Sequence, residues 1–172
     1  MFSKTDIERY FTAEKQESLI FLIVGIATIL LACVAYFYGR TSFFKGAAIP
    51  LLVFGLIQGF VGYTVYTRSD EDRKRNVYAY DMNPGELKSS ELPRMQKVIR
   101  NFVIYRWVEM ALAIASVVLL LYFRHRAGGL FWYGLGMALA VQSLFLLGAD
   151  HFAEKRVTEY TKGIESFVNK QP

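Results

Sequence analysis

Apolar and charged positions are separated into long blocks along this chain of 172 residues. Each apolar block is about twenty residues long, which is enough for an α-helix to cross the hydrocarbon core of a bilayer. The blocks cover residues 19–38, 47–66, 102–123 and 130–148. This pattern predicts an all-α membrane protein with four transmembrane helices, arranged as a single four-helix bundle that carries cytoplasmic helical extensions.

The link over residues 67–101 begins with the charged run SDEDRKR, which we expect to continue the second helix beyond the membrane. The rest of the link is expected to be irregular, with a turn where Pro84 fixes one dihedral and Gly85 supplies a positive φ. Ser90 is the expected N-cap of a third helix. Since no helix breaker follows Pro93, this helix is predicted to run unbroken over residues 91–123.

Both ends of the chain carry apolar residues at helical spacing. In the N-terminal segment, a capping box from Thr5 to Glu8 is expected to start a helix that lies on or enters the membrane interface. The apolar stripe of this helix consists of Ile7, Tyr10 and Phe11. In the tail, residues 149–172, the apolar seam is Ala153, Val157, Tyr160, Ile164 and Phe167. We expect this seam to pack on the extension of the third helix or on the N-terminal helix.

The placement of positive charge predicts the topology. Of twenty Lys and Arg residues, sixteen lie in residues 1–18, 67–106 and 149–172, and four lie in the links 39–46 and 124–129. Because positive residues favour the cytoplasmic side, both termini and the central link are predicted to be cytoplasmic. The bias argues against a dual-topology protein, which needs near-equal counts. We expect an integral, multi-pass protein of a bacterial plasma membrane.

Glu109 is an acidic residue within the third span, and a carboxylate at the centre of a membrane helix costs roughly 2.5–3.5 kcal/mol. Its depth predicts a polar cluster near the cytoplasmic ends of the spans with Tyr63, Asp150 and His151. Such a cluster could be a proton site, a cation site or a lipid-headgroup pocket. The alternative is an ion pair with Arg106, which lies one turn earlier on nearly the same face.

Two deeper polar residues, Gln58 and Gln142, belong to the same candidate site. They are expected to form an interhelical hydrogen bond, with a substrate contact as the alternative. They also fall at matching depths after the similar sequences YFYGR (residues 36–40) and YFRHR (residues 122–126). This match indicates either a duplicated helical hairpin or the aromatic and basic ends that membrane interfaces commonly produce.

The start of the third helix is basic and amphipathic, with Arg94, Lys97 and Arg100 beside apolar positions. These residues are candidate contacts for anionic lipid headgroups, since each positive charge near a charged leaflet contributes about 1 kcal/mol. Ordinary positive-inside placement explains the same residues equally well.

The sequence contains no nucleophile, phosphate-loop or dinucleotide-binding motif, so we expect no catalytic residue and no cofactor. His151 and Glu154 are one turn apart, but a metal site needs three or four ligands, and none is expected. The first functional hypothesis is a non-enzymatic interaction or scaffold subunit with a cytoplasmic face. Its partners would be the lipid bilayer and a second copy or another membrane protein, not nucleic acid. The alternatives are a small proton-coupled transporter that uses Glu109 and a lipid-modifying enzyme.

Overall fold

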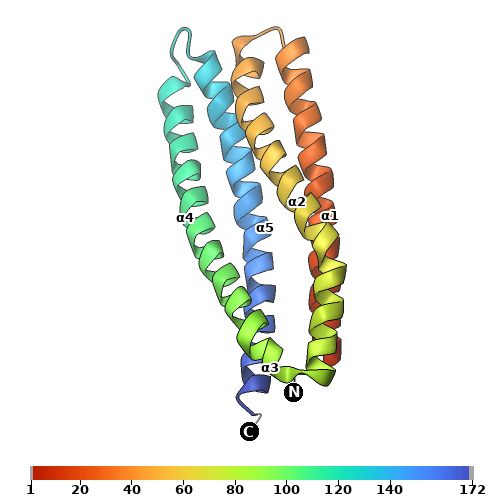
Figure 1. Cartoon of the computed structure of the whole chain (residues 1–172). Helices are drawn as coiled ribbons and strands as arrows, with labels where there is room; N and C mark the ends of the chain where they lie inside the picture. The colour runs from red at the N-terminus through yellow and green to blue at the C-terminus, as the bar shows by residue number, and fades with distance from the viewer. Residues whose placement is uncertain (1, 171–172) are drawn as a thin grey trace.

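The computed structural model describes residues 2–170, and every regular element in that range is helical. The long helices are α1 (Lys4–Tyr38), α2 (Ser42–Met82), α4 (Leu92–Phe123) and α5 (Leu130–Val168). The single-turn helix α3 (Pro84–Glu86) and the π-helix η1 (Leu87–Glu91) connect α2 to α4. Both chain ends lie at the same end of the molecule as this connection, and the other two connections lie at the opposite end (Figure 1).

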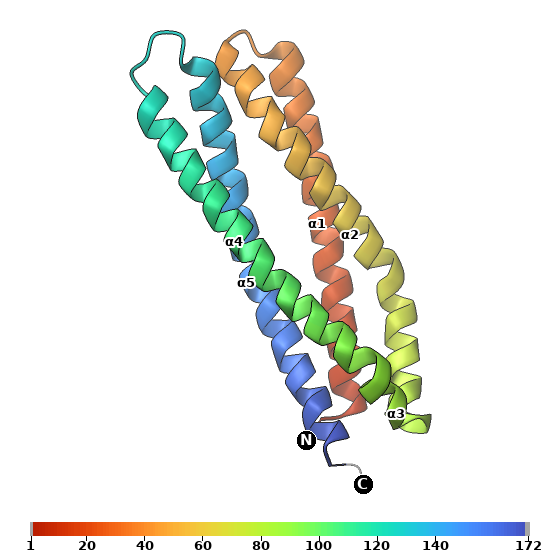
Figure 2. The same ribbon diagram turned by 60° about the vertical axis from the view of Figure 1, so that its left-hand side comes forward.

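Toward the end of the molecule with the two short connections, the four long helices lie side by side in the order α1, α2, α5, α4 (Figures 1 and 2). α2 and α5 contact each other in the middle, α1 packs on α2, and α4 packs on α5. Since α2 and α5 run in the same direction, the molecule consists of two parallel helical hairpins.

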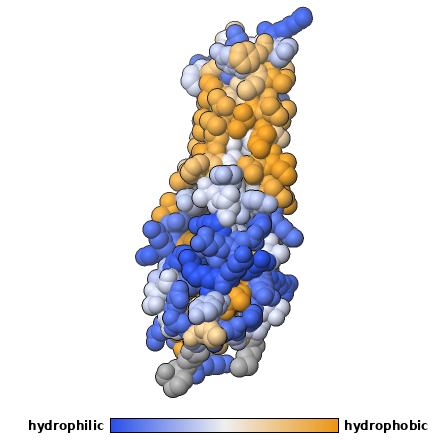
Figure 3. All heavy atoms as spheres, turned by 45° about the vertical axis from the view of Figure 1, so that its right-hand side comes forward, coloured by the Kyte–Doolittle hydropathy of each residue, from blue (hydrophilic) through white to orange (hydrophobic). Residues whose placement is uncertain are grey.

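The surface changes from hydrophobic to hydrophilic part-way along the helices (Figure 3). We call residues 19–66 and 102–148 the apolar half, and residues 2–18, 67–101 and 149–170 the polar half. Four helices are long and apolar enough to cross a membrane, if α3, η1 and α4 are taken as one. Their positions agree with the four predicted spans and support a multi-pass membrane protein.

Glycines bring the helices of the apolar half into close contact. A Cβ at Gly25 of α1 would lie 2.5 Å from the amide nitrogen of Gly59 and 2.9 Å from the carbonyl oxygen of Gly55, both in α2. A Cβ at Gly59 itself would meet nothing within 4 Å. Small residues that let helix backbones approach closely are typical of helices that pack in a membrane.

The two hairpins meet through matching positions on α2 and α5. Gly46 packs on the backbone of Phe131, and Gly134 packs on the backbone of Phe43. In each helix the Phe precedes its Gly by three residues, so the contacts are reciprocal. This is the packing expected of two similar hairpins related by an axis along the membrane normal.

The hydrophobic core lies in the polar half, where all four long helices and η1 contribute to it. The fully buried members are Ile7, Leu87, Met95 and Ile164, and Phe11 is only 1% exposed. From the apolar half, only Phe102 packs against the edge of this cluster. The large buried apolar side chains therefore lie mainly outside the apolar blocks.

The helical seam predicted for the tail is confirmed. Val157, Tyr160 and Ile164 are buried in the core, and the ring of Tyr160 stacks on that of Tyr10 with centroids 4.0 Å apart. Of the two predicted partners, the N-terminal helix therefore makes the closest ring contact. Tyr160 also donates a hydrogen bond of 3.4 Å to Glu91, just before α4.

The N-terminal stripe does not lie on an interface, because Ile7, Tyr10 and Phe11 are buried in the core and α1 continues directly into the first apolar block. The start of the helix also differs from the prediction. The backbone N–H of Ser3 donates to the Asp6 carboxylate at 2.8 Å, so the capping residues are these two.

The second helix continues through the charged run SDEDRKR as predicted, but the expected irregular stretch after this run was wrong, because it is also helical. α2 continues to Met82, and the chain turns only at Asn83. Ser90 is not an N-cap, since it lies inside η1. The apolar face of the α2 extension explains the difference, because Ala79 is buried in the core and Val77 and Tyr80 pack against it.

Candidate functional site

Four of the predicted polar residues line one pocket between α4 and α5, at the boundary of the two halves. These residues are Arg106, Glu109, Asp150 and His151, and the pocket has a volume of about 470 Å³. The helices set this geometry, because Arg106 and Glu109 are one turn apart on α4 and face the end of the fourth apolar block on α5.

The ion pair in this pocket is not the one expected as the alternative from the sequence, which joined Glu109 to Arg106. Arg106 pairs with the carboxylate of Glu154 on α5. Glu109 is 7% exposed, and its Oε2 has no hydrogen-bond partner among residues 2–170. The carboxyl group of Asp150 lines the same pocket and is near enough to interact with that of Glu109. Burial raises the pKa of Asp150 above its ordinary value.

The two glutamines lie elsewhere, between α2 and α5. The amide of Gln58 donates to the amide oxygen of Gln142 at 3.0 Å, and both side chains are buried. Such interhelical bonds contribute on average about 0.6 kcal/mol in a membrane. Tyr63 is 61% exposed on α2 and does not line the α4–α5 pocket. The predicted cluster is therefore divided into a pocket, a buried amide pair and an exposed tyrosine.

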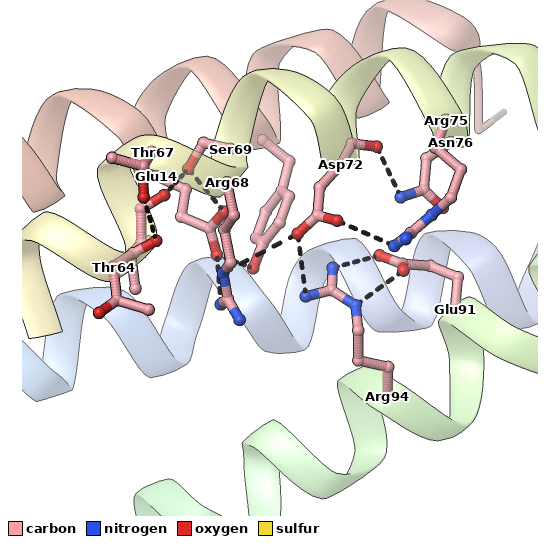
Figure 4. A network of polar contacts seen from close by, with 12 residues as sticks. Glu14, Thr64, Thr67, Arg68, Ser69, Asp72, Arg75, Asn76, Glu91 and Arg94 are labelled. Atoms are coloured by element: carbon pink, nitrogen blue, oxygen red, sulfur yellow. Dashed lines mark hydrogen bonds and ion pairs between the residues drawn. The ribbon is translucent and has the colours of Figure 1, made fainter.

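The three basic residues at the start of α4 also separate. Lys97 and Arg100 are exposed, as a lipid-headgroup contact requires. Arg94 instead turns inward, where its side chain is 24% exposed. Its guanidinium donates hydrogen bonds of 2.8 and 2.9 Å to Glu91 and lies 3.7 Å from Asp72 of α2 (Figure 4).

Arg94 belongs to an ion network inside the polar half that the sequence did not reveal. Asp72 forms a hydrogen bond of 2.9 Å with Arg75 and lies 3.8 Å from Arg68 (Figure 4). Arg68 lies 4.0 Å from Glu14 of α1. Three guanidinium groups therefore balance the carboxylates of Glu14, Asp72 and Glu91, and the network joins α1, α2 and α4.

Two tyrosines complete the network from the hydrophobic core. Burial raises the pKa of both Tyr10 and Tyr160, so their hydroxyls remain protonated and act as donors. Tyr10 donates to Glu14 at 3.3 Å, and Tyr160 donates to Glu91 at 3.4 Å. Burial also raises the pKa of Glu14, an effect that Arg68 and Arg94 oppose. The balanced charges and saturated contacts make the network a structural clamp.

The described residues, 2–170, contain no group of three or more His, Cys, Asp or Glu side chains placed to hold a metal ion. Glu154, which lies one turn from His151, forms an ion pair with Arg106.

Comparison of the chain with protein-family models, with curated proteins and with solved structures finds no match.

Proposed function

We propose that this protein is a non-enzymatic interaction subunit of a membrane, which crosses the bilayer four times and holds its polar half in the cytoplasm. The distribution of Lys and Arg supports this orientation, because sixteen of twenty lie in the segments that form or adjoin the polar half. The polar half then serves as a folded platform on the membrane surface.

The observation that carries the proposal is the combination of a closed core and an exposed apolar pair in the polar half. Tyr78 is 62% exposed and Met82 is 71% exposed, and they are one turn apart on α2. The only other exposed large apolar residue described in this half is Phe152, which lines the α4–α5 pocket. Tyr and Met are enriched at protein interfaces, so we infer that this pair contacts a protein partner.

The apolar half offers a second contact, along α4. In the most apolar 18-residue stretch of this helix only 11% of the residues are buried, against 33% in the corresponding stretch of α5. A partner helix would increase the burial of α4 and leave the platform accessible. This helix face supports either a second copy of the chain or another membrane protein as the partner.

The alternatives receive less support. A carrier that uses Glu109 needs a route through the apolar half, where Gln58 and Gln142 bond to each other and glycines pack α2 against both α1 and α5. A lipid-modifying enzyme that uses His151 would lack Glu154 as a helper, since this carboxylate pairs with Arg106.

Photocrosslinking in intact membranes tests the proposal. A photoreactive amino acid is placed at Tyr78 or Met82, and the matched control carries it at Ser166, an exposed position on α5. Positions 78 and 82 should give one discrete protein adduct, whose mass distinguishes a second copy from a different partner, while position 166 should give none. Equal adduct patterns at all three positions would refute the Tyr78–Met82 contact.

A further inference from the structure

The pocket between α4 and α5 combines an apolar wall with acidic groups. Phe102 and Met110 of α4 and Leu147 and Phe152 of α5 line it, together with the polar residues described above. An apolar molecule or chain would therefore be sheltered on both sides, and the acidic residues would face whatever polar group it carries.

Glu109 is the group in this pocket whose bonding is incomplete. Its side chain is more than nine-tenths buried and lines the pocket, yet its Oε2 accepts no hydrogen bond from any residue within 2–170. Arg106 does not satisfy it, because that guanidinium pairs with Glu154. A buried acceptor without a partner is rare in folded proteins and points to a donor that binds there.

Asp150 determines what kind of donor fits. Its carboxyl group lies beside that of Glu109, and two adjacent carboxylates repel each other unless a cation or a shared proton lies between them. A metal ion would need at least one more protein ligand, and the described residues supply no such group. A primary ammonium carries three N–H donors and needs only acceptors, which both carboxylates provide.

We propose that this pocket binds the primary ammonium group of a molecule with an apolar body, with Glu109 and Asp150 as the acceptors. The carboxylates hold the ammonium by charge-assisted hydrogen bonds, and the four apolar residues contact the body.

Two sources of this chemistry exist, an aminophospholipid and a free alkylamine. A second hollow of about 530 Å³ adjoins the pocket and shares Arg106, His151 and Glu154 with it. Arg106, Lys155 and Lys162 line this second hollow and outnumber its two carboxylates, Glu154 and Glu159, so a phosphate group next to the ammonium would meet a net positive charge. A free alkylamine would use the first pocket alone.

Native mass spectrometry of the purified full chain in detergent tests the site. The probes are phosphatidylethanolamine, phosphatidylcholine with the same acyl chains, and dodecylamine. Phosphatidylcholine has the same phosphate but no N–H donor on its nitrogen. The variants are Glu109→Gln and Asp150→Asn, and Glu71→Gln is the control, since Glu71 is exposed on α2 and remote from the pocket.

The wild-type chain should bind phosphatidylethanolamine at least about tenfold more tightly than phosphatidylcholine, because a hydrogen bond to a charged group is typically worth that factor or more. Both pocket variants should lose this preference, and Glu71→Gln should keep it. Dodecylamine binding that depends on Glu109 indicates that an alkylammonium suffices, and its absence indicates a lipid headgroup. Equal affinity of the wild type for all three probes, or a preference that survives in both pocket variants, would overturn the proposal.

Discussion

The polar and apolar halves hold the same four helices together by different means. In the polar half, water is present, so burial of residues such as Ile7 and Ile164 draws all four long helices into one core. In the apolar half, the helices meet through close glycine–backbone contacts and the buried Gln58–Gln142 hydrogen bond, which are the kinds of contact that pack helices in lipid. One helix can therefore be held by burial of large apolar side chains along part of its length and by small-residue contacts along the rest.

The apolar half is also the half that shows internal symmetry. The reciprocal contacts of Gly46 with Phe131 and of Gly134 with Phe43 relate the two hairpins. The polar half has no such symmetry, since Arg94 of α4 reaches across to Asp72 of α2. If the two hairpins arose by duplication, the segments of the polar half have since diverged, and these segments now form the hydrophobic core.

The largest expected effect tests the two halves with the same substitution. Ile164→Ala removes a fully buried side chain in the polar half and should lower the free energy of unfolding toward the upper end of roughly 2–5 kcal/mol. Ile114→Ala in the apolar half, at a residue that is 66% exposed, should change it by less than about 0.5 kcal/mol. Denaturation in mild detergent measures both, and equal losses would contradict the comparison.

Removal of Arg94 should have the next largest effect. Arg94→Met leaves Glu91 buried with its side chain only 3% exposed, and we expect a loss of about 3 kcal/mol, the lower end of the range for broken buried pairs. The double variant with Glu91→Leu should recover most of the loss, because no unpaired charge remains. Lys97→Met, at an exposed position on the same helix, is the control. A loss in the double variant as large as in the single one would show that the network is not a charge clamp.

A smaller effect tests how glycines pack α1 against α2 in the apolar half. Gly25→Ala should destabilise the protein by about 1–3 kcal/mol, since its Cβ would collide with the backbone of α2. Gly59→Ala should be close to neutral, although Gly59 lies at the same helix contact, because its Cβ would meet nothing within 4 Å. The same denaturation assay decides, and a large loss for Gly59→Ala would mean that the helices pack in another register.

The smallest effect concerns pH. Burial raises the pKa of Glu14 above its ordinary value of 4.5, so the folded state holds this proton more tightly than the unfolded state does. The contribution of Glu14 to stability should therefore fall as the pH rises from about 4.5 through the higher folded pKa. Glu14→Gln should remove that fall. The variant should therefore become increasingly more stable than the wild-type protein as the pH rises through this range. A constant difference from pH 4 to pH 8 would refute the role of burial.

The sequence predicted the features that depend on composition and local spacing. The apolar blocks predicted the four long apolar helices, and the seam of Val157, Tyr160 and Ile164 predicted the helix in the tail. The ion network combines local pairs, such as Arg94 with Glu91 and Arg75 with Asp72, with contacts that only folding creates. The contacts of Arg68 with Glu14 and of Arg94 with Asp72 join residues that are distant in the chain, so spacing along one helix could not predict them.

The structure brings only some of the predicted site residues together. Helical spacing and depth placed Glu109 near Asp150 and His151, which line one pocket. Neither spacing nor depth specifies which carboxylate an arginine selects, so the partner of Arg106 proved to be Glu154. The rotation of α2 about its axis, which leaves Tyr63 exposed and Gln58 buried, likewise depends on the glycine contacts.

The central claim is that the apolar half crosses the membrane and leaves the whole polar half on the cytoplasmic side. Single cysteines in a Cys33→Ala background test it directly, with Ser89→Cys in the α2–α4 connection and Ala127→Cys in the α4–α5 connection, both at exposed positions. A membrane-impermeant maleimide added to intact cells should label position 127 at once and position 89 only after lysis. Labelling of position 89 in intact cells would contradict the account.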